Sequence, residues 1–308
     1  MTTDYDPIAE QYKRAKLQPW RAHIEAYTLL GLLGDLSGKS LVDVACGDGY
    51  YTRRLRALGA AAVRGIDLSQ RMIDLARGQE AEHALGIEYE VGDARDLRLP
   101  APCDTAVAAY LLNYARDAAE LGAMCRGLAR CLETGGRFVT VNQSAALDFR
   151  SAPSYRPYGF ETTAAGEWRE GTPIMWTFYL DDGSFSIENY HLEPSTHEEA
   201  LRSAGFREVR WHAPRLSPRG LIHRWLRPPP DRPRAKPWNP PRCSCRLPAV
   251  PPCPGGTHRR RWPPPPAPRS RSGRSSRPVP PPGAAASRPS GPGPRAGAAP
   301  SPGRRSAA

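Results

Sequence analysis

The chain has 308 residues and a formal net charge of +12, and its composition changes sharply near residue 218. Residues 219–308 hold 25 of the 35 prolines and 18 arginines, carry a charge of +18 and contain no Phe, Tyr, Met, Glu or Gln, which leaves −6 on residues 1–218. This composition excludes a packed core in 219–308, and the absence of any apolar run of ~18 residues argues against a membrane-spanning protein.

We therefore expect one α/β domain over 1–218 and a disordered Pro/Arg-rich tail over 219–308. The first residues lack the basic and apolar regions of a signal peptide. The four cysteines before residue 218 are scattered through strand and helix patterns, as reduced, buried cysteines are. These features favour a cytoplasmic protein.

The expected elements begin with two helices over 5–33, the second opened by Pro19. From 41 to 142, short β-like apolar runs alternate with longer helical periodicities. The predicted strands are 41–45, 62–67, 87–91, 104–110 and 136–142. The predicted helices are 50–58, 69–83 and 115–132, with a shorter element near 94–98. This alternation predicts a Rossmann-like, doubly wound, mostly parallel sheet.

The pattern changes after residue 142. Residues 143–172 resemble a loop, and a hairpin follows, with strands at 174–180 and 185–192. We expect this region, about 143–192, to form a small antiparallel cap inserted into the domain. A capped helix ending near Ala204 and a strand at Phe206–His212 come next, and no strand-like run is expected beyond them.

The most informative segment runs Leu41-Val-Asp-Val-Ala-Cys-Gly-Asp-Gly-Tyr-Tyr-Thr52, a strand that enters a small-residue turn and then a helix. This segment resembles the first motif of the class I S-adenosylmethionine (SAM)-dependent methyltransferases, with alanine in place of its first glycine. The alanine is tolerated if its φ stays negative. The resemblance implies cofactor contacts from Asp43, Ala45, Cys46, Gly47 and Gly49.

Further motifs fall at the spacing that this resemblance requires. Asp67, at the end of the second strand, would accept the ribose hydroxyls, and Asp93 and Ala94, after the third strand, would read the adenine. The resemblance adds apolar adenine walls from Leu68 and Met72. Tyr12, in an N-terminal segment that closes over the cofactor in such enzymes, and Tyr110, at the end of the fourth strand, complete the predicted cofactor contacts.

The acceptor site is expected beyond the fourth and fifth strands and on the cap. Its predicted residues are Asn113, Tyr114, Asn142, Trp176 and Tyr190. His191 is the candidate general base, with a structural role as the alternative. The N-terminal segment and cap resemble bacterial natural-product methyltransferases, including the toxoflavin-synthase-like group, which implies a small-molecule acceptor methylated on nitrogen or oxygen.

Two other enzyme classes fit less well. A dinucleotide-binding oxidoreductase requires a third glycine where Thr52 stands. A phosphate-binding P-loop requires a glycine where Leu33 stands, and Gly38-Lys39-Ser40 precedes a strand instead of following one.

The tail allows a third alternative, nucleic-acid binding through its arginines. A GC-rich reading frame translated out of register would also give this composition, because Arg, Pro, Gly and Ala use GC-rich codons. We therefore hypothesise a frameshift near Pro218. Cys243, Cys245, Cys253 and His258 could supply zinc ligands, but their Pro/Arg-rich surroundings offer no supporting hydrogen bonds, and no metal site is predicted.

Overall fold

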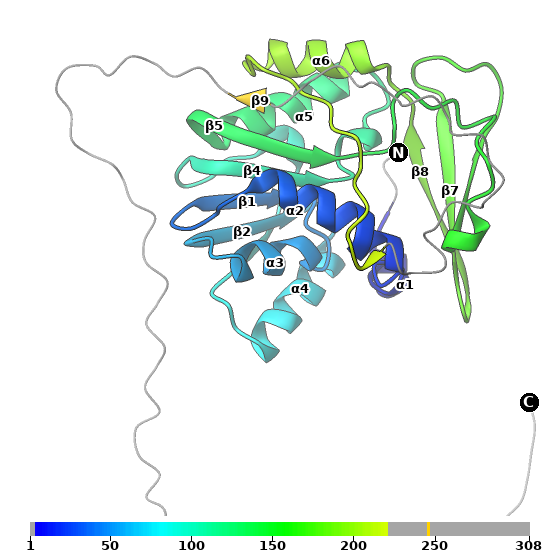
Figure 1. Cartoon of the computed structure of the whole chain (residues 1–308). Coiled ribbons are helices and arrows are strands. Elements are labelled where there is room, and N and C mark those ends of the chain that lie inside the picture. Colours follow the sequence, from blue (N-terminus) through cyan, green and yellow to red (C-terminus); the bar gives the residue numbers. More distant parts are fainter. Residues whose placement is uncertain (1–3, 221–244, 247–308) are drawn as a thin grey trace, which may run out of the picture. The chain divides into compact units, whose positions relative to one another are not determined.

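The computed structural model describes residues 4–220 and 245–246, and all of them belong to one compact unit (Figure 1). Its centre is a six-stranded sheet in the order β3-β2-β1-β4-β5-β9. The strands are β1 (Ser40–Val44), β2 (Ala62–Asp67), β3 (Glu88–Val91), β4 (Cys103–Ala109), β5 (Leu132–Val141) and β9 (Cys245–Arg246). Strands β1 to β5 are parallel and β9 is antiparallel, which confirms the predicted Rossmann-like sheet.

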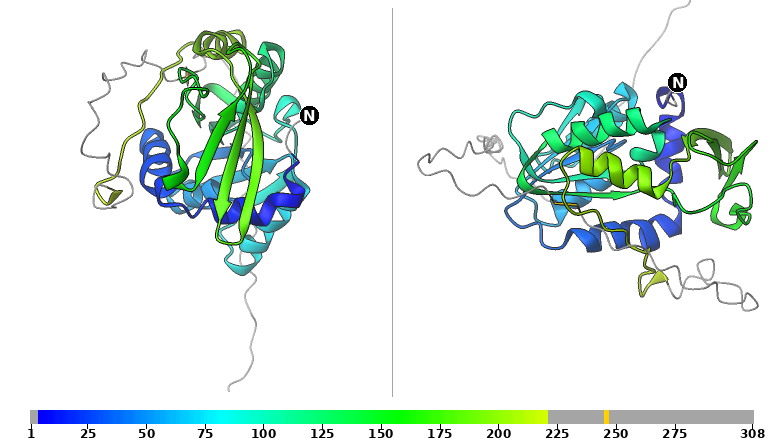
Figure 2. Two further views of the ribbon diagram at one scale, coloured as in Figure 1. Left: turned by 90° about the vertical axis from the view of Figure 1, so that its right-hand side faces the viewer. Right: turned by 90° about the horizontal axis from the view of Figure 1, so that it is seen from above.

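Helices cover both faces of this sheet (Figures 1 and 2). The helices are α2 (Tyr27–Leu33), α3 (Tyr50–Ala57), α4 (Gln70–Glu82), α5 (Ala118–Arg130) and α6 (Pro194–Ser203). Neighbouring strand residues face opposite layers: Leu41 packs in the cluster with α2 and α3, and Val42 packs in the cluster with α5 and α6. Successive buried residues on both faces, as in β1, are typical of parallel strands covered on both sides.

The N-terminal region and the cap lie at the same end of the sheet (Figure 2). The N-terminal elements are η1 (Asp6–Ile8), α1 (Ala9–Ala15) and η2 (Arg21–Ala26), a π-helical segment that continues into α2. The cap is an antiparallel sheet of β6 (Phe160–Ala164), β7 (Pro173–Leu180) and β8 (Gly183–Tyr190). One apolar cluster joins Tyr12 of α1 to Met72 of α4 and to Phe178 of the cap.

Two short elements differ from the prediction. The region 143–172 is not all loop, because it contains η5 (Arg156–Tyr158) and β6, whose residues pair with β7. The element near 94–98 is one 3-10 turn, η3 (Ala94–Asp96), which Asp93 caps by accepting a hydrogen bond from the backbone of Arg95. In 143–172 the frequent Pro and Gly residues obscured short structure, whereas the element near 94–98 exists but is shorter than predicted.

The strand predicted at Phe206–His212 is wrong. Phe206 is buried against Phe138 of β5, with ring centroids 6.0 Å apart, but the segment forms no strand. The chain instead runs back to α2, where Arg215 N donates to Thr28 Oγ1 over 2.8 Å. The expectation of no later strand is also wrong for two residues, because β9 pairs with Arg137 and Phe138.

The other calls on the tail lie outside the described residues. They are its disorder, the frameshifted sequence and the cluster of Cys243, Cys253 and His258, whereas the domain boundary at residue 218 stays a prediction. Within 4–220 and 245–246, no helix is both long enough and apolar enough to cross a membrane.

Candidate functional site

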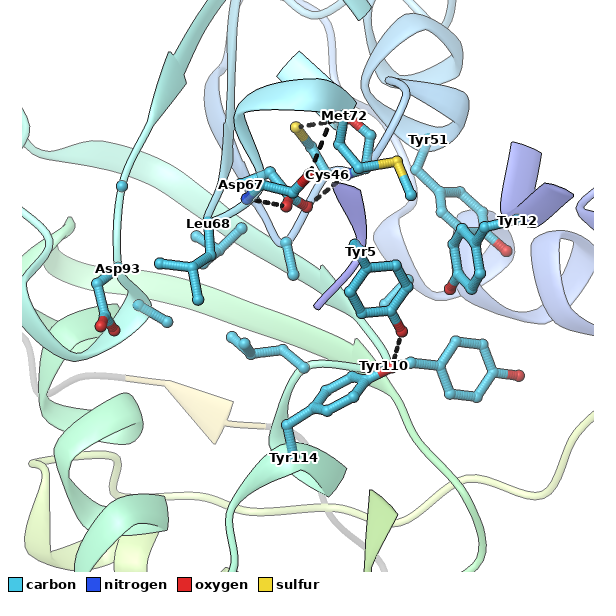
Figure 3. A pocket seen from close by; sticks show the side chains of 18 of the residues that line it. Tyr5, Tyr12, Cys46, Tyr51, Asp67, Leu68, Met72, Asp93, Tyr110 and Tyr114 are labelled. Atoms are coloured by element: carbon cyan, nitrogen blue, oxygen red, sulfur yellow. Dashed lines mark hydrogen bonds between the residues drawn. The ribbon is translucent and has the colours of Figure 1, made fainter. Parts of the chain in front are cut away.

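A cavity of about 390 Å³ lies at the carboxyl ends of the parallel strands (Figure 3). Its walls come from the loops after β1 to β4 and from η1, α1 and η2. The predicted binding residues that line it are Tyr12, Ala45, Cys46, Gly47, Asp67, Leu68, Met72, Asp93, Ala94, Tyr110 and Tyr114. Parallel strands bring these separate loops to one edge of the sheet, where ligands of such folds bind.

The loop after β1 follows a left-handed path. Ala45, Gly47 and Gly49 have φ values of 61°, 58° and 86°. The expectation of a negative φ at Ala45 is therefore wrong. The loop is tied to the sheet because Cys46 N donates to the carbonyl of Ile66 over 3.0 Å, and this turn forces the alanine backbone into a strained region.

Replacing Ala45 with glycine should remove this strain. We expect the variant to gain about 0.5–1 kcal/mol in free energy of unfolding, since glycine adopts positive φ without steric cost. Urea denaturation measures the gain. Ala108→Gly, at a buried position inside β4 without a positive φ, is the control and should lose stability. Equal losses in both variants would contradict the strain argument.

Asp67 joins β2 to the glycine loop. Its Oδ2 accepts from Gly47 N over 2.8 Å, and its Oδ1 accepts from Ser69 N over 2.9 Å. Burial raises the pKa of Asp67, and these two backbone hydrogen bonds oppose the rise. The carboxyl group is thus held in place at the cavity wall and keeps lone pairs for ligand hydroxyls.

Next to Asp67, the cavity has an apolar wall and a second carboxylate. Leu68 is 54% exposed and lies between Asp67 and Asp93 in Figure 3, and Ala94 also lines the cavity. Asp93 accepts hydrogen bonds from Arg95, over 2.9 Å from its Nε, and this pairing lowers the pKa of Asp93. An exposed leucine next to an ionised acid suits a flat, polar-edged ring such as a purine.

Lys16 and Asp48 form a buried ion pair beside the glycine loop. Lys16 Nζ lies 3.0 Å from Asp48 Oδ1, and both side chains are less than one-tenth exposed. Burial is the largest influence on the pKa of Lys16 and alone would lower it, but the charge of Asp48, its hydrogen bond and the nearby Tyr12 together outweigh burial and raise the pKa. A Cβ on Gly47 would lie 2.8 Å from the lysine nitrogen, so the cation sits directly against the loop backbone.

A second buried charge network lies on η2. Glu25 accepts from Tyr51 Oη at Oε1 over 2.5 Å and from Tyr110 Oη at Oε2 over 2.6 Å. Arg21 Nη1 lies 3.2 Å from the same carboxylate. Tyr110 has a φ of 62°, which is strained for a residue other than glycine. The network connects η2, α3 and the end of β4 around the cavity.

Tyrosine rings complete the wall opposite the glycine loop. The phenol groups of Tyr5 and Tyr114 point toward one another and are hydrogen-bonded, as Figure 3 shows. The rings of Tyr5 and Tyr12 meet edge to face with centroids 5.0 Å apart. Burial raises the pKa of both Tyr5 and Tyr114, so these phenols stay protonated at neutral pH.

Comparison with known proteins agrees with this geometry. Residues 41–136 match the family model described as "Methyltransferase domain". Residues 41–136 are a methyltransferase domain, and the fold is that of the class I SAM-dependent methyltransferases. It is 26% identical over 174 residues to N-demethylindolmycin N-methyltransferase of Streptomyces griseus, a match that covers 55% of this chain and 70% of that protein. This identification displaces the oxidoreductase alternative.

Two further relatives extend the comparison. The methyltransferase is 29% identical over 174 residues to 27-O-demethylrifamycin SV methyltransferase of Amycolatopsis mediterranei, and the match covers 56% of this chain and 60% of that protein. A solved SAM-dependent methyltransferase from Clostridium acetobutylicum shares the fold, with a TM-score of 0.53 at 14% identity over 78% of this chain and 99% of that one.

The residues of the methyltransferase fit SAM. That molecule carries a sulfonium, an ammonium and a carboxylate, and the cavity presents both carboxylates and the cations of Lys16 and Arg21. Gly47 lets the loop backbone approach a ligand, which a side chain would prevent. Asp67 lines the cavity with carboxylate oxygens of the kind that ribose hydroxyls require, and Leu68 and Met72 add apolar surface of the kind that adenine requires.

Seven predicted residues do not line the cavity; they are Asp43, Gly49, Asn113, Asn142, Trp176, Tyr190 and His191. Asp43 is 1% exposed and accepts from Thr52 Oγ1 over 2.7 Å, so it supports the loop from beneath. Trp176 Nε1 donates to Gln143 over 3.2 Å within the cap, and the phenol of Tyr190 donates to Glu188.

The two asparagines are also held away from the cavity. Asn142 Nδ2 donates to Thr140 Oγ1 over 3.2 Å, which leaves its Oδ1 buried without a hydrogen-bond partner. Asn113 is 3% exposed, and both polar atoms of its side chain lack a partner.

His191 has a structural environment. Its side chain is 2% exposed and stacks on Trp168, with ring centroids 4.2 Å apart. Its Nε2 lies 3.1 Å from Glu193 Oε1. Because its ring stacks on Trp168, its Nε2 faces Glu193 and its side chain does not line the cavity, we do not retain His191 as a general base.

Among the cavity-lining residues that sequence reasoning missed are Tyr5, Lys16, Arg21, Glu25 and Tyr51. The signal was present in their spacing, because Tyr12 and Lys16, like Arg21 and Glu25, are four residues apart in helical segments. A charged residue on the same helix face as an aromatic residue indicates a buried ionic group. Because burying a charge is costly, such groups are found mainly where a functional site uses them.

Proposed function

We propose that this methyltransferase transfers the methyl group of SAM to a nitrogen or oxygen atom of a small-molecule acceptor. One observation carries the proposal: a single cavity is bounded by the cofactor loops on one side and by the phenols of Tyr5, Tyr110 and Tyr114 on the other. The two relatives described above are named for small molecules, one methylated on nitrogen and one on oxygen.

The chain's own residues would hold both reactants. SAM supplies an activated methyl group on its sulfonium. Asp67 would accept the ribose hydroxyls, Leu68 and Met72 would hold the adenine, and Asp93 would bind its amino group. Arg95 now occupies the Asp93 carboxylate and would have to share it with the ligand.

The tyrosine wall would act by positioning and by excluding water. Methyl transfer is an in-line displacement with a good leaving group, so orientation and desolvation supply much of the acceleration. Protonated phenols at Tyr5 and Tyr114 can donate or accept hydrogen bonds but cannot serve as bases. Of the predicted acceptor contacts, we retain Tyr114, and the aromatic faces nearby would also favour a cationic sulfonium.

Replacing Asp67 with alanine tests the proposal. We expect the affinity of the full chain for S-adenosylhomocysteine to fall about 100-fold, since charge-assisted hydrogen bonds contribute roughly 1.5–3 kcal/mol. Isothermal titration calorimetry measures the loss. Mass spectrometry of co-purified nucleoside, followed by an acceptor screen with labelled SAM, identifies the substrate.

Asp148→Ala is the matched control. Asp148 also accepts a backbone hydrogen bond two residues along the chain, from Arg150 N over 2.9 Å, but does not line the cavity. Its replacement should leave nucleoside affinity unchanged. A wild-type chain that binds neither SAM nor S-adenosylhomocysteine would refute the proposed function.

A further inference from the structure

Residues 213–220, which we call the strap, lie across η2 and the first turn of α2. After Phe206 the chain leaves the central sheet and runs to these N-terminal helices, as Figures 1 and 2 show. No residue of the strap lines the cavity. Ser217 is nevertheless only 8% exposed, and Gly220 is buried, so the strap is packed against the helices and does not simply pass over them.

The strap is hydrogen-bonded to η2 and to α2. On η2, Ser217 N donates to the carbonyl of His23 over 2.8 Å, and Ser217 Oγ lies 3.0 Å from His23 Nδ1. The same Oγ accepts from Gly220 N over 3.0 Å, which turns the end of the strap around the serine. On α2, Arg215 N donates to Thr28 Oγ1 over 2.8 Å. Ser217 is therefore the residue through which the strap holds η2.

The strap also approaches η2 very closely at Gly220. A Cβ on this glycine would lie 2.9 Å from the Cβ of His23 and 2.5 Å from Cδ1 of Leu216. The leucine methyl is the end of a side chain that can rotate, but the Cβ of His23 is fixed to the helix backbone. Any side chain at residue 220 would therefore push the strap away from η2.

The opposite face of η2 forms part of the cavity wall. Arg21 and Glu25 line the cavity with side chains 4% and 3% exposed, whereas His23 between them does not line it. Glu25 accepts hydrogen bonds from Tyr51 and Tyr110 over 2.5 and 2.6 Å. Hydrogen bonds of this length tolerate little movement of the helix that carries the carboxylate.

Two features make this position of η2 costly to maintain. The segment is π-helical, a form that is rare and is found mostly as single turns, frequently at functional sites. Arg21 and Glu25 are buried as an ion pair, and Nε of Arg21 has no hydrogen-bond partner. Such an arrangement persists only where the surrounding structure holds it in place. The strap supplies contacts of this kind from the side away from the cavity.

We propose that the strap fixes η2 against the cavity, and that Ser217 is a positioning residue that acts on ligand binding through Arg21 and Glu25. Ser217 holds the carbonyl and the ring of His23, which is two residues away from each of them. The inference goes beyond the proposed function and uses its cofactor product as the readout. It does not depend on which part of the ligand the two charged residues contact.

Two variants of the full chain loosen the strap by different means. Ser217→Ala removes the hydroxyl that lies between His23 and Gly220, and Gly220→Ala crowds the strap away from η2. We expect each variant to bind S-adenosylhomocysteine about 3- to 10-fold more weakly than wild type in calorimetry, a loss of the size expected for one hydrogen bond. Wild-type affinity in both variants would overturn the proposal.

A double-mutant cycle tests the route through η2. Arg21→Gln/Glu25→Gln removes both buried charges of η2 together, and we expect it to bind S-adenosylhomocysteine more weakly than wild type. If the strap acts by placing these two side chains, adding Ser217→Ala to this variant should cause no further loss of affinity. A further loss as large as the one in the wild-type background would show that the strap acts elsewhere and would overturn the assignment.

Ser40→Ala is the matched control for stability. The hydroxyl of Ser40 also joins two elements, since it donates to Asp104 Oδ2 over 2.8 Å and accepts from Asp104 N over 3.2 Å. Ser40 begins β1, at the end of the strand away from the cavity. Its replacement should lower the urea midpoint as Ser217→Ala does and leave nucleoside affinity unchanged. Equal losses of affinity in the two variants would mean that stability, and not positioning, controls binding.

Hydrogen exchange separates the strap from the proposed function. If wild type binds no nucleoside, the proposed function fails, and the amides of residues 21–26 then report on the strap alone. Ser217→Ala should speed their exchange, and Ser40→Ala should not. Unchanged exchange of residues 21–26 in Ser217→Ala would show that the strap does not hold η2.

Discussion

Replacing Gly49 with alanine is expected to destabilise the methyltransferase by about 2–5 kcal/mol, the sum of a left-handed backbone penalty and overpacking. Gly49 has a φ of +86°, and a Cβ there would lie 2.5 Å from Tyr89 Oη and 3.1 Å from its Cζ. Tyr89 is 6% exposed beneath the loop and cannot move aside without disturbing the α4 cluster. Urea denaturation of the full chain measures the loss.

Two further variants test the cause. Tyr89→Phe removes the Tyr89 hydroxyl, which is the group nearest to the added Cβ and is buried without a hydrogen-bond partner. This variant should therefore lose little stability by itself, and it should restore about 1–2 kcal/mol of stability in the Gly49→Ala background. Gly78 lies inside α4, and no atom lies within 4 Å of the position that its Cβ would take. Gly78→Ala should therefore stabilise the protein by roughly 0.5–1 kcal/mol. A Gly49→Ala variant as stable as wild type would show that the loop can take another path.

The sheet could be predicted because its signals are local. Alternating apolar runs fix five parallel strands, and the strand ends then bring Asp67, Asp93 and the glycine loop to one edge. The fourth strand likewise places Tyr110 and Tyr114 at the cavity. No long-range contact had to be guessed to reach this part of the site.

The remaining part of the site depends on tertiary contacts. The sequence does not reveal that Glu25 meets Tyr51 and Tyr110, because the three residues come from separate elements. Nor does it show that His191, directly after β8, faces Trp168 instead of the cavity, since the alternation along this segment specifies two faces without saying which element covers each.

Positive φ at Ala45 was also beyond sequence reasoning. An alanine signals nothing about its own φ, and the preference of L-residues for negative values led to the wrong expectation. The same applies after α6, where Phe206 has the apolar character of a strand residue but the following backbone hydrogen bonds go to α2.

Replacing Asp43 with asparagine should stabilise the chain at alkaline pH. Burial raises the pKa of Asp43 to about 7, although the hydrogen bond from Thr52 and the charge of Lys16 both lower it. Its Oδ1 is buried without a partner. Above pH 7 the folded protein must therefore hold a charged carboxylate out of water, whereas the unfolded chain ionises it freely. An asparagine keeps the acceptor for Thr52 and removes that charge.

The sign of the effect follows from proton binding. Because the folded-state pKa lies above the ordinary value of 3.8, the folded state holds more protons between pH 4 and 7, and the contribution of Asp43 to stability falls as pH rises through that window. The gain from Asp43→Asn should reach on the order of 2–4 kcal/mol at pH 8 and nearly vanish at pH 4, since each pKa unit corresponds to about 1.4 kcal/mol. Urea titrations at several pH values measure it.

Asp35→Asn serves as the matched control of opposite sign. Asp35 is exposed, and hydrogen bonds from the backbone and hydroxyl of Ser37 lower its pKa, so its ionised form stabilises the fold and its replacement should reduce stability at pH 8. A gain from Asp43→Asn that is equal at pH 4 and pH 8 would mean that the benefit comes from packing. In that case the ionisation of Asp43 would not be what destabilises the folded protein at alkaline pH.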